Sequence, residues 1–192
     1  MAKYIKPKLK TLQKYGLAPE SKSIRRKLQK PIRKSAYGER LEQKQKLKII
    51  YGVMERQMRR YVREAKKSKN DPQSDLLQKL ETRLDNVAYR LGFGKTIGQA
   101  RQLVNHGHVL VNDKKVDIPS YALKPGERIS LNDKILRKKI FSEQVESNRK
   151  NLSPVGYLEY EINAGRFLSV PDKNDLAKNV DISKVMEFYH RM

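Results

Sequence analysis

Residues 80–121 constrain the fold of this chain more than any other stretch of its sequence. Two short segments there, 86–91 and 96–105, have the apolar spacing of amphipathic helices, with basic residues beside the apolar positions. Each is followed by a glycine, Gly92 or Gly107, a residue that readily adopts the left-handed backbone found after a helix. The stretch therefore predicts two short helices that end in tight turns.

Polar residues mark the second helix start and the turns that follow it. Thr96 and Gln99 have the spacing of a capping box, in which each side chain bonds a free backbone N–H of the first turn. Turn-forming residues then recur at Asn112-Asp113-Lys114 and Pro125-Gly126. The short apolar runs around them predict strands at 108–111, 115–118 and 127–131. A compact two-helix unit with a small sheet is expected.

Residues 39–67 also have helical spacing. At about 100° per residue, one side is apolar and holds Leu47, Ile50, Met54, Met58, Tyr61 and Ala65. The opposite side is basic and holds Lys48, Arg56, Arg59, Arg60, Arg63, Lys66 and Lys67. Gly52 leaves open a division of this stretch into two helices.

A further helix is predicted from Gln73, because Asp71 can cap it and Pro72 suits its first position. Lys79 and Arg83 are four residues apart and are expected on one face, and Asp85 could cap the next short helix. Beyond the small sheet, the patterns predict a helix at 137–150, a hairpin of 157–162 and 167–170 joined through Asn163-Ala164-Gly165, and a helix or turn at 182–189.

The charge of the chain is strongly asymmetric. The formal net charge is +22, of which residues 1–70 contribute +18 and residues 141–192 contribute −1. Such a concentration of Lys and Arg is typical of a nucleic-acid contact surface. Residues 1–36 also contain Pro7, Gly16, Pro19 and Pro31, so we expect a basic arm that orders on RNA. A mitochondrial transit peptide is the alternative, but the basic character continues past residue 60.

Several other functions are disfavoured by the sequence. The chain has no cysteine, and none of its apolar runs approaches the ~18 residues that span a membrane. Gly94-Lys95-Thr96 lacks the earlier glycine of a nucleotide-binding phosphate loop, since Tyr89 occupies that position. The His106-Gly107-His108 pair has no nearby cysteine or acidic cluster. We therefore expect no enzyme activity, metal, cofactor, membrane or small-molecule substrate.

Five segments together resemble a known family. They are 35–46, 51–57, Leu84-Asp85-Asn86-Val87 with Ala100-Arg101-Gln102-Leu103 and His106, Tyr157-Leu158-Glu159, and Val185-Met186-Glu187-Phe188-Tyr189. Over nearly its full length the chain is similar to the family of ribosomal small-subunit protein four, of the bacterial or organellar type.

The resemblance implies a structural protein that binds the five-prime domain of small-subunit rRNA at a multi-helix junction and nucleates subunit assembly. It also implies contact with small-subunit protein five, a role in translational accuracy, and other ribosomal proteins near the mRNA entry path as neighbours. Leu9 and Leu12 stand where many relatives carry metal-binding cysteines, so zinc is not expected. Thr96-Ile97-Gly98 replaces a more basic pattern, which puts one phosphate contact in doubt.

The predicted fold class is α+β, with a mainly helical N-terminal domain and a small two-helix RNA-binding module with a short, mostly antiparallel sheet. The expected parts are a basic arm at 1–36, a helical domain at 37–80 joined by 180–192, the RNA-binding module at 81–143, and a helix and hairpin segment at 144–179. The residues expected to contact rRNA are Arg40, Lys44, Lys46, Arg56, Arg59, Lys79, Arg83, Arg90, Lys95, Arg101, Gln102 and His106.

Two other functions remain as alternatives. One is an RNA-modifying enzyme, such as a pseudouridine synthase, that carries the same module; the other is a free RNA chaperone. The enzyme is disfavoured because too few residues remain for a catalytic domain and no active-site cluster is visible. The sequence leaves open whether the ribosome is that of a bacterial cytoplasm, a plastid or a mitochondrion.

Overall fold

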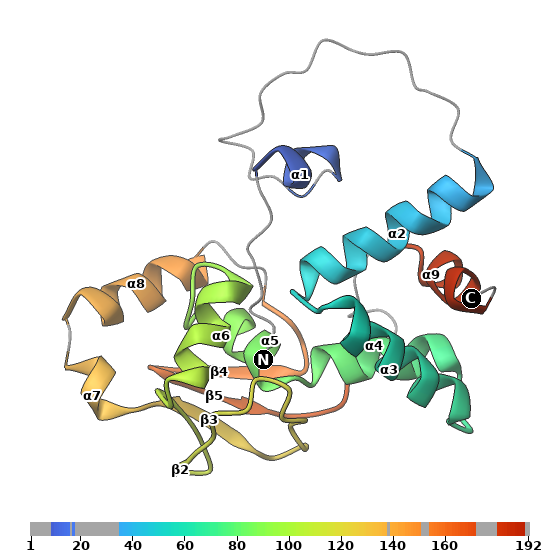
Figure 1. Cartoon of the computed structure of the whole chain (residues 1–192). Helices are drawn as coiled ribbons and strands as arrows, with labels where there is room; N and C mark the ends of the chain where they lie inside the picture. Colours follow the sequence, from blue (N-terminus) through green and yellow to red (C-terminus); the bar gives the residue numbers. More distant parts are fainter. Residues whose placement is uncertain are drawn as a thin grey trace. The chain divides into compact units, whose positions relative to one another are not determined.

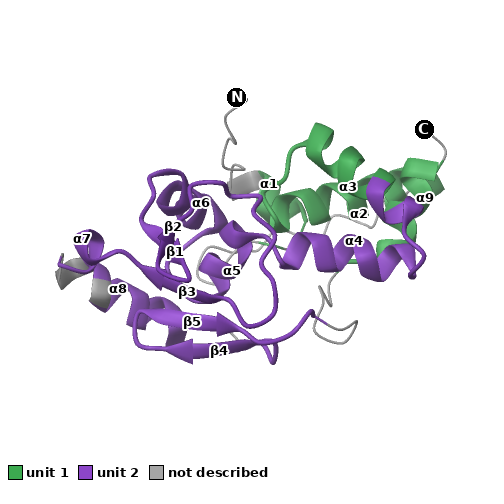
Figure 2. Cartoon of the chain, turned by 90° about the horizontal axis from the view of Figure 1, so that it is seen from below, with its two compact units in different colours: residues 1–63, 179–192 green, residues 64–178 purple. Residues whose placement is uncertain are grey.

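The computed structural model describes residues 9–15, 17, 35–137, 139–150, 154–171 and 180–190 (Figure 1). The chain forms two compact units (Figure 2), of which unit 1 comprises residues 1–63 and 179–192 and unit 2 comprises residues 64–178. The expectation of an arm that orders on RNA falls almost wholly outside the described residues. Helix α1, Leu9–Lys14, is the main part of that segment that is described.

Unit 1 is helical. It contains α2 (Ala36–Ile50), most of α3 (Glu55–Lys67) and α9 (Ile182–His190). The helix expected over 39–67 is divided, because Gly52 adopts a left-handed backbone with φ of +59° between α2 and α3. Leu47, Met58, Tyr61 and Ala65 are buried as the apolar stripe predicts. Met54 is 40% exposed, because it lies in the connection and not in a helix.

Contacts within unit 1 fix α9 against α2. The Nε of Arg40 donates to a carboxylate oxygen of Glu187 at 2.7 Å, and Lys184 donates to Glu39 at 2.9 Å. Nearer the middle of α2, the ammonium group of Lys44 lies 4.4 Å from the centre of the Phe188 ring. Segments from the two ends of the described chain therefore build one helical unit.

Unit 2 contains the remaining long elements. Its helices are α4 (Pro72–Glu81), α5 (Leu84–Arg90), α6 (Ile97–Asn105), α7 (Asp133–Leu136) and α8 (Lys139–Lys150). Its strands are β1 (Val109–Val111), β2 (Lys114–Lys115), β3 (Arg128–Leu131), β4 (Leu158–Glu161) and β5 (Ala164–Phe167). Helix α4 thus belongs to unit 2, which also contains the sheet. From the sequence, α4 was instead expected in the helical domain at 37–80.

The helix ends follow local chemistry. The carboxylate of Asp71 accepts from the backbone N–H groups of the first turn of α4, ahead of Pro72. Thr96 accepts from the N–H of Gln99, but the side chain of Gln99 accepts from the N–H of Lys95 and not from that of Thr96. The expected capping box is therefore only half formed. Asp85 does not cap α5, which begins at Leu84, two residues earlier than predicted. The Asp85 side chain is bonded to Arg83 and Arg101 instead.

The five strands form one antiparallel sheet in the order β2-β1-β3-β5-β4. Asn112 and Asp113 both have positive φ in the tight turn between β1 and β2. The predicted hairpin near the C-terminus exists but turns at 162–163, earlier than expected, since Asn163 takes the left-handed conformation. Strand β5 pairs with β3, so this hairpin extends the sheet that β1, β2 and β3 form.

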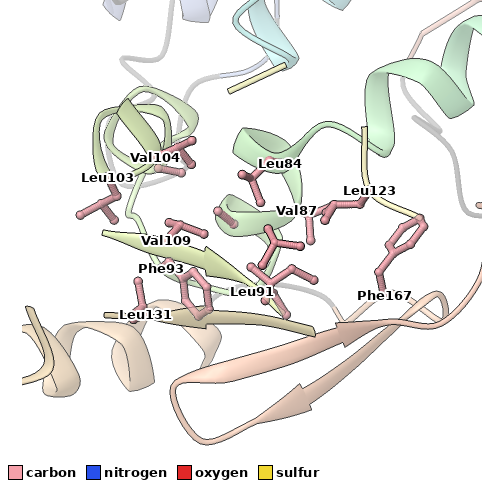
Figure 3. Packing of buried hydrophobic residues seen from close by; sticks show 14 of the residues in the cluster. Leu84, Val87, Leu91, Phe93, Leu103, Val104, Val109, Leu123, Leu131 and Phe167 are labelled. Carbon is pink, nitrogen blue, oxygen red and sulfur yellow. The ribbon is translucent and has the colours of Figure 1, made fainter. Parts of the chain in front are cut away.

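Helices α5 and α6 pack on one face of this sheet (Figure 3). Leu84, Val87 and Leu91 of the α5 region point toward Val109, Leu131 and Phe167 of the sheet. All six are almost fully buried, which removes most of their apolar area from water and provides the main driving force for this packing. The α+β fold class predicted from the sequence is confirmed.

Candidate nucleic-acid interface

Helix α3 carries more cations than any other described helix. Its exposed cations, here called the α3 basic stripe, are Arg56, Arg59, Arg60, Arg63, Lys66 and Lys67. Only two acidic residues, Glu55 and Glu64, belong to the same helix. The buried residues Met58, Tyr61 and Ala65 lie on its other side. The stripe is therefore held toward solvent by the packing of the apolar side.

Glu55, at the start of α3, lies among several donors. Lys48 and the Tyr189 hydroxyl donate to it at 2.7 and 2.8 Å, and Lys44 lies at 3.2 Å. Partial burial pushes the pKa of this carboxyl upward, but the hydrogen bonds from Lys48, Tyr189 and Lys44 outweigh it and lower the pKa to about 2. The carboxylate consequently remains charged at neutral pH and pairs with both Lys44 and Lys48.

The three α2 residues expected to contact RNA have different surroundings. Arg40 is engaged with Glu187, and Lys44 is only 6% exposed, between Glu55 and the Phe188 ring. A cation over an aromatic face is stabilised by the ring quadrupole. Lys46 is half-exposed. Lys44 is thus an internal contact of unit 1.

Arg83 and Arg101 share one carboxylate in unit 2. Asp85 is fully buried and accepts from the Nε and Nη2 of Arg83 at 3.0 and 2.8 Å, and from the Nε of Arg101 at 2.7 Å. The Arg83 side chain is 3% exposed and that of Arg101 is 14% exposed. Since α4 ends at Glu81, Arg83 does not share a helix face with Lys79, contrary to the spacing argument.

A second buried carboxylate lies close in sequence. Glu81 is fully buried and accepts from Arg90, from the Nδ2 of Asn86 and from the hydroxyl of Tyr157 at 2.9 Å. Burial, and next the negative charge of Glu81, raises the pKa of the Tyr157 hydroxyl. Sequence reasoning missed Glu81 and Tyr157, which are 76 residues apart and have no local pattern that joins them.

The remaining expected contact residues of unit 2 are accessible. Lys95, Gln102 and His106 are exposed along α6 and its two ends, and Lys79 is half-exposed beside Asp75. Within unit 2, the predicted contacts therefore separate into accessible side chains and arginines that two buried carboxylates hold in place.

Metal and membrane sites are not apparent in the described part of the chain. No group of three or more His, Cys, Asp or Glu side chains there could hold a metal ion. No described helix is long and apolar enough to cross a membrane.

Comparison with known proteins decides the family. Residues 82–129 match the model of the S4 domain, and residues 3–81 match that of the ribosomal protein S4/S9 N-terminal domain. The small ribosomal subunit protein uS4 of Acholeplasma laidlawii is 41% identical over 183 residues, which cover 95% of this chain and 88% of that relative. This chain belongs to the uS4 family of small ribosomal subunit proteins.

Other uS4 proteins also match over most of this chain. The uS4B protein of Clostridium acetobutylicum is 40% identical over 196 residues and covers both chains completely. The uS4 protein of Thermus thermophilus is 45% identical over 160 residues, or 83% of this chain and 77% of that relative. These bacterial relatives are named as ribosomal proteins, not as enzymes, so the RNA-modifying enzyme is not supported, and the resemblance seen in the sequence is confirmed.

Proposed function

We propose that this uS4 family member binds small-subunit rRNA directly, at a junction of the five-prime domain, and nucleates assembly of the subunit. The observation that carries the proposal is the α3 basic stripe, in which six exposed cations accompany only two acids. A surface of this kind neutralises phosphates and releases the counterions condensed on RNA.

Within unit 2, the proposed direct contacts are Lys95, Gln102 and His106, which are exposed. Arg83, Arg90 and Arg101 contribute differently, because their guanidinium groups are bonded to Asp85 and Glu81 and their positions are fixed by the fold. In unit 1, Lys46, Arg56 and Arg59 are the proposed contacts, whereas Arg40 and Lys44 mainly hold α9 in place.

The test is the salt dependence of affinity for a five-prime-domain rRNA fragment. Each phosphate contact contributes a log–log slope of about −0.7 to −0.9, so Arg56→Ala and Arg59→Ala should each reduce the slope by about one contact. Lys134→Ala, on the exposed side of α7, is the matched control and should leave the slope unchanged. Affinity that does not vary with salt, or equal effects at all three positions, would contradict the proposal.

We also propose that the protein contacts small-subunit protein five and supports translational accuracy, as family membership suggests. Cross-linking within assembled small subunits tests the contact. Recovery of cross-links only to other neighbours would overturn it.

A further inference from the structure

The sheet of unit 2 has two edge strands, and they differ in how they are protected. Strand β2 forms one edge and has only two residues, Lys114 and Lys115, both exposed. Short length and exposed lysines keep an edge strand from pairing with another chain. Strand β4 forms the other edge, at the rim of unit 2 in Figure 2. It contains no lysine or proline, and its two charged residues, Glu159 and Glu161, are both acidic. The β4 edge is therefore open to a strand of opposite charge.

The register of β4 with β5 shows which backbone groups are unpaired. The carbonyl of Tyr157 accepts from the N–H of Leu168. Because alternate residues of an antiparallel strand bond the same neighbour, Glu159 bonds β5, whereas the N–H and C=O of Tyr160 point away from it. The N–H of Ile162, at the start of the turn, is not bonded either. Among the described residues, no backbone group pairs with these donors and this acceptor.

The side chains along this edge are acidic and apolar. Glu159 is exposed and forms no ion pair in the described part of the chain, and Glu161 is half-exposed and bonded to Arg128 at 3.0 Å. Ile162 is 89% exposed, more than any other large apolar side chain that the structure describes. Residues 141–192 contribute −1 to a chain of net charge +22. The carboxylates would repel RNA phosphates but attract a basic protein segment.

We propose that the β4 edge receives an extended basic segment of a neighbouring protein in the small ribosomal subunit, which adds to the sheet as a sixth strand. In strand addition, backbone bonds provide affinity and alternate side chains provide selectivity. The segment bonds Tyr160 through its backbone and presents Lys or Arg at alternate positions to Glu159 and Glu161. Its side chains also cover Ile162. None of these residues belongs to the proposed rRNA contacts.

Amide hydrogen exchange at single-residue resolution tests the backbone contact, on the free protein and on purified small subunits. The amides of Tyr160 and Ile162 should exchange rapidly in the free protein and become protected by about tenfold or more in the subunit. The amide of Glu159, which is bonded to β5, is the internal control and should be protected in both. Equally rapid exchange of Tyr160 and Ile162 in both forms would overturn the proposal.

A photoreactive benzoylphenylalanine at position 162 identifies the occupant. In purified subunits it should cross-link to a protein segment that has Lys or Arg at alternate positions. Cross-links to RNA, cross-links to a protein segment without that pattern, or no cross-link at all would contradict the proposal.

Two substitutions test the edge without disturbing the hairpin. Ile162→Pro removes a donor and an exposed side chain, and proline suits this position, because Asn163 with φ of +56° follows it as in a type II turn. It should abolish the protection of the Tyr160 amide in the subunit. Glu159→Gln should lower that protection about threefold, as for one exposed ion pair. Glu143→Gln, an equal charge change on the exposed side of α8, is the matched control.

The same variants separate this inference from the proposed function. All three should bind the five-prime-domain rRNA fragment as tightly as the unaltered protein, because none changes a proposed rRNA contact. Unchanged protection of Tyr160 in Ile162→Pro would refute strand addition and leave rRNA binding unaffected. Failure of the unaltered protein to bind the rRNA fragment would refute the proposed function instead.

Discussion

Burial should decide the strength of two tyrosine–glutamate hydrogen bonds that are otherwise alike. The Tyr157 hydroxyl donates to Glu81 at 2.9 Å, and the Tyr121 hydroxyl donates to Glu127 at 2.9 Å. Tyr157 is 1% exposed and Glu81 is fully buried, whereas Tyr121 and Glu127 are half-exposed. Phenylalanine at either position keeps the ring and removes only the donor.

In the buried pair, no water can replace the lost donor. A hydrogen bond to a charged group contributes about 1.5–3 kcal/mol in such a place, so Tyr157→Phe should lower the free energy of unfolding by that amount. In the partly solvated pair, water takes the place of the hydroxyl, and Tyr121→Phe should cost at most about 0.5–1 kcal/mol. Urea denaturation followed by circular dichroism measures both. Equal losses at the two positions would refute the argument from burial.

High pH provides a second measurement on the same residue. Burial, and next the charge of Glu81, raises the pKa of the Tyr157 hydroxyl above the ordinary value of 10.0. Above about pH 10 the unfolded chain therefore releases this proton while the folded protein keeps it, and stability falls as pH rises. Tyr157→Phe should lose stability less steeply with pH in that range, and an unchanged slope would contradict the assignment.

Three further changes test other contacts. The stability of unit 1 should fall as pH drops from about 4.5 toward 2, since the pKa of Glu55 is lowered to about 2 in the folded protein. Glu55→Gln should remove that part of the acid transition. A series of thermal melts at different pH values measures both effects. Gly165→Ala should destabilise by about 1–3 kcal/mol in urea denaturation, because its Cβ would lie 2.3 Å from a methyl carbon of Leu91. Arg149→Met should cost at least about 2 kcal/mol by the same assay, because the guanidinium donates to the carbonyls of Leu91, Glu161 and Ala164 and these would lose their donor. A loss below 0.5 kcal/mol at either position, on the order of an ordinary surface substitution, would contradict the contact.

The features predicted correctly from the sequence depend on residues close together in the chain. Asp71 caps α4, and Gly92 and Gly107 end their helices with positive φ. The division of the long helical stretch, which the sequence left open, occurs at Gly52. Each of these depends on interactions within about one helical turn, so the local residue types were sufficient.

The errors arose where a distant residue changes the environment of a side chain. Lys44 has the sequence pattern of a surface cation, but Phe188 and Glu55 enclose it. Arg83 was expected on one helix face with Lys79, but its guanidinium bonds the buried carboxylate of Asp85 and its side chain is buried. The pairing of β5 with β3 could likewise not be predicted from the sequence, because the paired residues are more than thirty positions apart and strand pairing has no local signal.

The construction of unit 1 from two separated stretches sets an order of maturation during synthesis. Residues 64–178 are translated without interruption, at roughly 5–20 residues per second in general, and the sheet with its helices can be completed as soon as they emerge. Helix α2 is made much earlier, yet its contacts with Phe188 and Glu187 do not exist until α9 follows. The part of the chain that is synthesised first is therefore the part that reaches its final form last.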